Sequence, residues 1–92
     1  MEIEYSQTAL KDLKKFDQTD RAFVIKKLLY LCENYTVLKE GKKVREIVNS
    51  QYGKAMRFTI NRKIRVIFKE EDERLILLIL RVGLRSNIYD EI

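Results

Sequence analysis

The second half of the chain carries basic side chains and one tyrosine that together could handle a phosphodiester. They are Lys54, Arg57, Arg65, Arg81, Arg85 and Tyr89. An arginine side chain is a planar, permanently charged fork that can grip two phosphate oxygens at once. Several of them on one surface would bind a phosphodiester backbone and stabilise the extra negative charge of a pentacovalent transition state. A tyrosine beside them could stack on a base or transfer a proton.

These residues also allow a purely structural interpretation, in which Arg57 and Arg81 only pair with Glu46 or Asp90 on a solvated strand.

The composition excludes several kinds of catalytic and metal-binding site. The chain has no histidine and a single cysteine, which excludes imidazole acid–base pairs, Ser–His and Cys–His nucleophiles and zinc sites of histidine or cysteine. The carboxylates are not spaced like magnesium ligands. We therefore expect no metal and no cofactor, and a ribonuclease with this inventory would use the 2′-hydroxyl of its RNA as the nucleophile.

Positive charge is concentrated in one stretch of the chain. The net charge is +5, from 19 basic and 14 acidic residues. Residues 1–38 are neutral and residues 70–92 carry −3, whereas residues 39–69 carry +8. A local excess of this size attracts polyanions. Besides the arginines named above, we expect this stretch to contact RNA through four lysines and arginines in its loops and turns: Lys42, Lys43, Arg62 and Lys63.

The size and the single thiol indicate one small domain in a reducing compartment. Its 92 residues are enough for one modest core, and no linker divides them, so we expect a single domain over residues 1–92. Cys32 cannot form an internal disulfide and reads as a buried small hydrophobe. The start of the chain lacks the apolar run of a signal peptide, and the apolar run at residues 75–80 is too short to span a membrane. We expect a cytoplasmic protein.

The first 38 residues predict one strand followed by two helices. Residues 3–6 alternate as a short strand, and Ser6 can cap a first helix that ends near Asp17. Thr19 or Asp20 can cap a second helix, whose apolar residues recur at helical spacing as far as Tyr35. Two short amphipathic helices in succession indicate a helical hairpin.

After a basic loop at residues 39–43, the apolar period changes from that of a helix to that of a strand. Strands are expected at residues 44–48, 56–60, 64–69 and 75–82, with turns at residues 61–63 and 70–73. The last strand is apolar on both faces and should be central. We expect an α+β fold: a short N-terminal strand, a two-helix hairpin, then a three- to four-stranded antiparallel sheet with the helices on one face and the other face partly open. Whether Arg57 and Arg65 share that face depends on the hairpin register, which the sequence leaves undetermined.

Three segments of the chain carry a combined pattern. An apolar strand ends in Arg81-Val82-Gly83-Leu84-Arg85 and is followed by Tyr89. Residues 5–17 combine a short strand with a helix, and residues 53–68, with Arg65-Val66-Ile67-Phe68, read as a hairpin. These segments resemble the C-terminal signature, the first strand and helix, and the hairpin of the RelE/ParE superfamily of toxins from type II toxin–antitoxin systems, and the resemblance covers nearly the whole chain.

The resemblance implies the RelE-like β-α-α-β-β-β fold and a ribosome-dependent mRNA endonuclease that works without metal. It would make Arg65 and Arg85 transition-state stabilisers, Arg57 a phosphate contact or an aid to deprotonation of the 2′-hydroxyl, and Tyr89 a stacking or orienting group. It also implies mRNA and the ribosome as partners, together with a cognate acidic antitoxin in a possible hetero-oligomer, and no membrane partner. The chain departs from the pattern at two positions. Thr59 stands where some relatives have a second basic residue, and Leu84 where many have histidine.

Two other functions stay open at this stage. The ParE side of the superfamily would make the chain an inhibitor of DNA gyrase that cleaves nothing, and the departures at Thr59 and Leu84 favour it. A third possibility is an RNA- or ribosome-binding module without activity. Gly83 could provide a positive φ or a close approach of the backbone to RNA, or it could be an ordinary glycine at a strand end.

Overall fold

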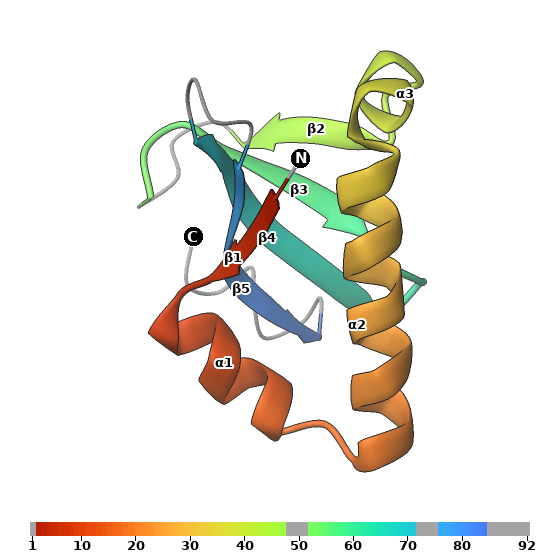
Figure 1. Cartoon of the computed structure of the whole chain (residues 1–92), viewed down its shortest axis with the longest axis vertical. Coiled ribbons are helices and arrows are strands. Elements are labelled where there is room, and N and C mark those ends of the chain that lie inside the picture. The colour runs from red at the N-terminus through yellow and green to blue at the C-terminus, as the bar shows by residue number, and fades with distance from the viewer. Residues whose placement is uncertain (1, 48–51, 72–75, 85–92) are drawn as a thin grey trace.

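The structure, a computed structural model, describes residues 2–47, 52–71 and 76–84. In chain order its elements are β1 (Glu2–Tyr5), α1 (Gln7–Lys14), α2 (Gln18–Glu33), α3 (Tyr35–Glu40), β2 (Val44–Ile47), β3 (Ala55–Thr59), β4 (Ile64–Glu71) and β5 (Ile76–Leu84). This order confirms the predicted α+β class, with a strand first, helices next and a meander last (Figure 1). None of the described helices is long and apolar enough to cross a membrane.

The sheet is larger than expected and it is mixed. The described residues form five strands in the order β1-β5-β4-β3-β2. Strand β1 pairs with β5 in parallel, while the three remaining pairs are antiparallel. The central position of the apolar last strand is confirmed, because β5 lies between β4 and β1. A strand that is apolar on both faces needs a neighbour at each edge, and the N-terminal segment supplies the second one.

The helical hairpin begins as predicted, but its turn differs. Ser6 caps α1, and its hydroxyl accepts from the Ala9 amide at 3.0 Å. Helix α1 ends at Lys14, earlier than expected, and the cap of α2 is Asp17, whose carboxylate accepts from the Asp20 amide at 2.8 Å. The prediction of Thr19 or Asp20 as the cap was wrong, because Asp17 is already extended and has the acceptor that the first free amides need.

A third helix, α3, follows the second one, and the prediction of a loop from residue 39 was wrong for Lys39 and Glu40, which belong to α3. Helix α2 ends at Glu33, and Asn34, with φ −118° and ψ 22°, breaks it before Tyr35 starts α3. The Tyr35 hydroxyl donates to Glu70 at 3.0 Å. Glu70 was predicted to lie in an acidic turn, but it belongs to β4. This long-range hydrogen bond ties α3 to the sheet, which a reading of local periodicity could not detect.

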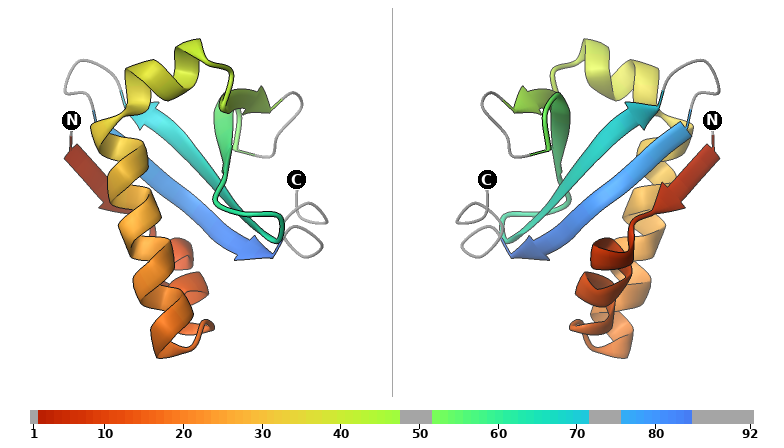
Figure 2. Two further views of the ribbon diagram at one scale, coloured as in Figure 1. Left: turned by 90° about the vertical axis from the view of Figure 1, so that its right-hand side faces the viewer. Right: turned by 90° about the vertical axis from the view of Figure 1, so that its left-hand side faces the viewer.

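The main core lies on one face of the sheet. Helix α2 runs along that face, in front of the strands in the left view of Figure 2 and behind them in the right view. Its buried residues are Val24, Leu28, Leu31 and Cys32, which confirms the interpretation of Cys32 as a small buried hydrophobe. They pack in one cluster with Phe58, Val66, Phe68, Leu77 and Ile79 of the sheet. The opposite face has only a small cluster around Ala55 and Ile67, so much of it stays open, as predicted.

Candidate nucleic-acid interface

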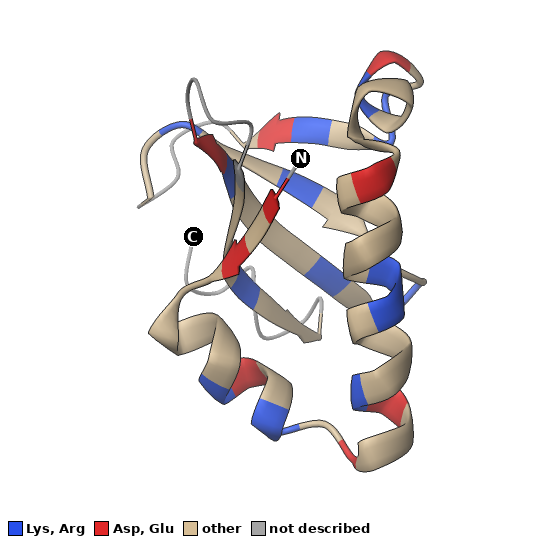
Figure 3. Ribbon diagram, viewed as in Figure 1, with Lys and Arg blue, Asp and Glu red and all other residues tan. Residues whose placement is uncertain are grey.

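The hairpin registers place the predicted arginines on the open face. Arg57 is opposite Arg45 on one side and Ile67 on the other, and Ile67 is opposite Arg81. In the next row, Thr59, Arg65 and Gly83 are opposite one another on three strands. Their alternate neighbours Phe58, Val66 and Val82 belong to the main core on the other face. The question that the sequence left undetermined is thus resolved: Arg57 and Arg65 share the open face. Figure 3 shows Lys and Arg residues, in blue, on β2, β3 and β4.

A shallow basic hollow lies over β2, β3 and β4. Its volume is about 500 Å³, and we call it the basic hollow. The residues that line it are Gly41, Lys42, Lys43, Arg45, Arg57, Phe58, Thr59 and Arg65. Five of these are cations and none is a carboxylate. Arg45 and Arg57 are directly opposite across two strands, an arrangement of like charges that costs stability. Such a surface is suited to an anion with several charges.

The turn before β2 places two lysines at the hollow. The Lys43 amide donates to the Leu38 carbonyl at 2.9 Å and the Lys42 amide to the Lys39 carbonyl at 3.1 Å. This pair of hydrogen bonds is the Schellman ending of a helix, in which the residue after the cap takes the left-handed conformation. Glycine usually occupies that position, but here it is Lys42, with φ 60°. Arg45 Nε closes the turn by donating to the Lys42 carbonyl at 3.3 Å.

Arg65 is oriented by a neutral partner. Its Nη1 donates to the Thr59 hydroxyl across the β3–β4 pair. Its Nε is buried and, among the described residues, finds no hydrogen-bond acceptor. An unsatisfied buried donor is unusual and costs free energy that an incoming acceptor would recover. The guanidinium therefore keeps its full charge and part of its donor capacity at the edge of the hollow.

Arg81 is oriented by a carboxylate instead. Its Nε and Nη2 donate to the two Asp12 oxygens at 2.7 and 3.1 Å, and Asp12 also accepts from the Val82 amide at 3.0 Å. Asp12 is only 4% exposed. These hydrogen bonds raise the pKa of Arg81 further above its usual value. The fork thus joins α1 to β5, and much of the charge of Arg81 is offset, in contrast to that of Arg65.

The other predicted site residues are not gathered in the basic hollow. Lys54, Arg62 and Lys63 are exposed at the two ends of the β3 strand, outside its lining. The predicted turn at residues 61–63 is confirmed, and the Asn61 side chain accepts there from the amides of Lys63 and Ile64. Arg85 and Tyr89 lie outside the described residues. Gly83 does not have a positive φ, so the first of the uses expected for it is wrong.

Sequence reasoning missed two polar residues of the hollow, Arg45 and Thr59. Arg45 was counted only as part of the +8 stretch, and Thr59 was noted only as the loss of a basic residue. The sequence carries a weak signal for Arg45, since it follows Lys43 by two and so shares its face on an extended strand. Its place opposite Arg57 required the pairing register.

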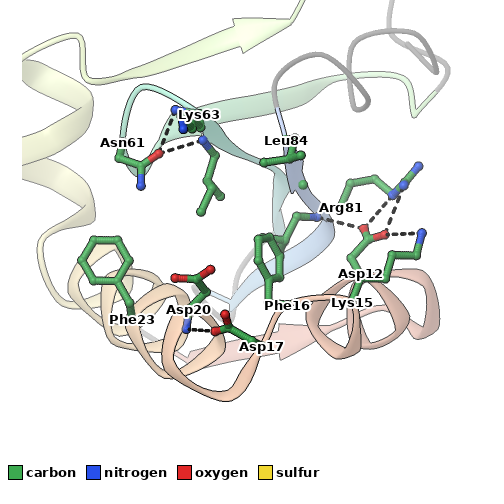
Figure 4. Close-up of a pocket in the computed structure, with 13 residues that line it drawn as sticks. Asp12, Lys15, Phe16, Asp17, Asp20, Phe23, Asn61, Lys63, Arg81 and Leu84 are labelled. Carbon is green, nitrogen blue, oxygen red and sulfur yellow. Dashed lines mark hydrogen bonds and ion pairs between the residues drawn. The ribbon is translucent and has the colours of Figure 1, made fainter.

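A second hollow, of about 660 Å³, lies between the α1–α2 turn and the β3–β4 turn (Figure 4). We call it the apolar hollow. Phe16, Phe23, Ile64 and Leu84 form its apolar wall, and charged side chains such as Lys15, Asp20 and Lys63 surround them. Phe23 and Leu84 are 40% and 43% exposed, high for large apolar side chains.

Within the described part of the chain, no three histidine, cysteine or acidic side chains gather to hold a metal ion.

Known proteins share this fold. The toxin of the Mycobacterium tuberculosis complex RelBE2 is 19% identical, with a TM-score of 0.73 over 91% of this chain and 96% of that one. YafQ from Escherichia coli is 23% identical, with a TM-score of 0.71 over 96% and 97% of the two chains. The isolated Escherichia coli RelE toxin is 20% identical, with a TM-score of 0.65 over 98% and 92%.

The chain matches a protein family but no curated protein sequence. The family of ParE toxins of the type II toxin–antitoxin system parDE matches over residues 3–89, which is nearly the whole chain and confirms the superfamily predicted from the sequence. With the RelE-like fold, this match shows that the chain belongs to the ParE toxin family and is the toxin of a toxin–antitoxin system.

Proposed function

We propose that this toxin is a ribosome-dependent mRNA endonuclease whose substrate backbone lies in the basic hollow. The observation that carries the proposal is the gathering of five cations, Lys42, Lys43, Arg45, Arg57 and Arg65, around one hollow whose described lining residues include no carboxylate. Arginine forks bind phosphodiester oxygens in pairs, and an open sheet face gives an extended strand of RNA room to lie flat. The sheet is a rigid support for such a site, because β4 is paired on both edges.

The proposed reaction uses the 2′-hydroxyl of the RNA as its nucleophile. The oxygen attacks the adjacent phosphorus, its proton leaves to a base, and the 5′-oxygen of the next nucleotide departs with a proton. Negative charge accumulates on the phosphoryl oxygens, where Arg65 and Arg57 would stabilise it. Arg85 and Tyr89, outside the described residues, are proposed to protonate the leaving oxygen and to orient the nucleotide. Lys42, Lys43 and Arg45 would hold the flanking phosphates, and Lys54, Arg62, Lys63 and Arg81 are proposed as outer RNA contacts.

The direct test is primer extension on a defined mRNA, with and without ribosomes, after addition of the purified toxin. Cleavage at fixed positions is expected only when ribosomes are present. Intact mRNA in both reactions, at a toxin concentration that arrests translation, would rule out the endonuclease.

A second candidate function has specific support. The family match is to ParE toxins, and Thr59 and Leu84 depart from the pattern of the RNA-cleaving toxins. The toxin would then inhibit DNA gyrase and leave mRNA intact. A supercoiling assay with purified gyrase separates the two: inhibition at toxin concentrations that leave ribosome-bound mRNA uncut would favour this alternative.

We further propose that a cognate acidic antitoxin silences the toxin. Several structures with the same fold are toxin–antitoxin complexes, including the RelE–RelB complex of Pyrococcus horikoshii. The apolar hollow offers exposed Phe23 and Leu84 to an antitoxin helix or strand. Acidic antitoxin residues would meet the basic 39–69 stretch. Expression of the toxin alone should arrest growth and co-expression of the antitoxin should restore it, whereas harmless expression of the intact toxin would refute this role.

A further inference from the structure

Two arginines of the open face are held in different ways, and the difference bears on their use. Arg81 is bound by Asp12, a buried carboxylate that offsets its charge. Arg65 is bound by Thr59, a neutral hydroxyl. A carboxylate partner would lower the attraction of Arg65 for an anion, and a lysine at position 59 would repel its guanidinium. A hydroxyl orients the guanidinium and leaves its charge unchanged.

The surroundings of Arg65 explain why it needs such a partner. Its neighbour on the other side, in the β4–β5 pair, is Gly83, which has no side chain to pack against it. Lys42, Lys43, Arg45 and Arg57 line the same hollow and repel it. An arginine side chain has many rotamers, and restricting it to one costs conformational entropy. In a preorganised site this restriction is already in place before the ligand binds. Among the described residues, the Thr59 hydroxyl is the acceptor that holds the Arg65 guanidinium toward the hollow.

The geometry of the guanidinium leaves one fork open. Thr59 takes Nη1. In a guanidinium, Nε and Nη2 point the same way and form the side-on fork that binds two oxygens of one phosphate. Nε of Arg65 is buried and without an acceptor among the described residues, so a modest shift that brings a phosphate oxygen to it would satisfy the donor.

We propose that Thr59 is a positioning residue that holds Arg65 for side-on capture of a phosphate in the basic hollow. Where some relatives have a second basic residue, this chain would have a hydroxyl that orients Arg65. This inference rests on the proposed function for its ligand class, but its test reads phosphate binding alone and does not need RNA cleavage.

The test is a titration of the full chain with inorganic phosphate. Binding is monitored through the Nε–Hε signals of the arginines in nuclear magnetic resonance spectra. Arg65→Lys identifies the Arg65 signal by its loss. Thr59→Val keeps the branched shape and removes the hydroxyl, whereas Thr59→Ser keeps the hydroxyl. We expect the Arg65 signal to shift on phosphate addition, with a Kd raised about threefold to tenfold by Thr59→Val and nearly restored in Thr59→Ser. The melting temperatures of both variants should stay close to that of the wild type, since Thr59 is exposed.

Two results would overturn the proposal. One is an equal phosphate Kd for Thr59→Val and the wild type. The other is a Thr59→Ser variant as weak as Thr59→Val. If phosphate capture follows the hydroxyl while ribosome-bound mRNA stays uncut, Thr59 keeps its positioning role and only the endonuclease fails.

Discussion

At the scale of single residues, the basic hollow contains features that lower the stability of the fold. Lys42 has a left-handed backbone where glycine is usual. Arg45 and Arg57 are opposed like charges, and the buried Nε of Arg65 finds no acceptor within the described ranges of the chain. Such costs persist where a site uses them. The sequence singles out Arg57 and Arg65 as candidate site residues, but it could not reveal these costs, because they arise from φ angles and from pairing across strands.

Lys42 allows stability and binding to be separated. Lys42→Gly should relieve the left-handed strain and raise the free energy of unfolding by about 0.5–1 kcal/mol, after the entropy that glycine adds to the unfolded chain. It should also weaken RNA binding by removing a cation. Lys42→Ala, the matched control, should weaken binding equally without the gain in stability. Urea unfolding and RNA titration of both variants check this, and equal stabilities for the two would contradict the strained turn.

At the scale of elements, periodicity predicted the helices and strands but not the contacts that order them. The pattern through Tyr35 is continuous in the sequence, although α2 and α3 are separate helices. The Tyr35 hydroxyl donates to Glu70. The Tyr35 ring packs edge-on against the Phe68 ring, with 5.9 Å between the ring centroids. Lys39 of α3 also pairs with Glu70, at 3.4 Å. These contacts fix α3 on the sheet, and α3 in turn leads into the Lys42 turn of the basic hollow.

The Tyr35 contact should appear in the pH dependence of stability. Burial, then the hydrogen bond and the charge of Glu70, raise the pKa of Tyr35 above its ordinary value of about 10. The folded state therefore holds this proton more tightly than the unfolded state does. The contribution of Tyr35 is complete below about pH 10 and is lost as the pH rises toward the folded-state pKa. Urea midpoints measured across this range should fall less steeply for Tyr35→Phe than for the wild type, and parallel curves would refute the assignment.

Arg21 should matter for the α1–α2 turn, which the sequence placed only roughly. Its Nε donates to the Leu13 carbonyl at 3.0 Å and its Nη2 to the Phe16 carbonyl at 3.0 Å. Arg21→Ala should lower the free energy of unfolding by about 1–2 kcal/mol, because these carbonyls at and just after the end of α1 lose a side-chain donor. Arg21→Lys keeps the charge but not the fork and should recover less than half of the loss. Chemical denaturation of the three proteins would show this, and an unchanged Arg21→Ala would dismiss the clamp.

At the scale of the whole molecule, the charge segregation seen in the sequence becomes a surface. The +8 stretch at residues 39–69 includes β2, β3 and most of β4, on which Figure 3 shows Lys and Arg in blue. Its strand residues Arg45, Arg57 and Arg65 lie on the face opposite the main core. The segregation could be read from the sequence, because it needs only counting. Which of these cations share a hollow could not, since Lys54, Arg62 and Lys63 lie in the same stretch but outside the lining.

This surface should give RNA binding a strong dependence on salt. Each phosphate contact on single-stranded RNA adds about 0.7 to the slope of log K against log salt, through counterion release. Replacing Lys42 and Lys43 together by alanine should therefore make the slope shallower by about 1.4. The matched control replaces Lys11 and Lys26, two exposed lysines on the helices, and should change the slope far less. Equal effects of the two double substitutions would mean that the overall charge matters and the basic hollow does not.

The central claim is that the cations of the basic hollow promote cleavage of mRNA on the ribosome. The measurement that tests it most directly is the single-turnover cleavage rate of ribosome-bound mRNA by the wild type, Arg65→Ala and the control Lys26→Ala. We predict a rate about 10²–10³-fold lower for Arg65→Ala, because one preorganised cation is lost from the transition state, with wild-type cleavage by Lys26→Ala. Cleavage at the wild-type rate by a folded Arg65→Ala, or no cleavage by the wild type itself, would contradict the claim.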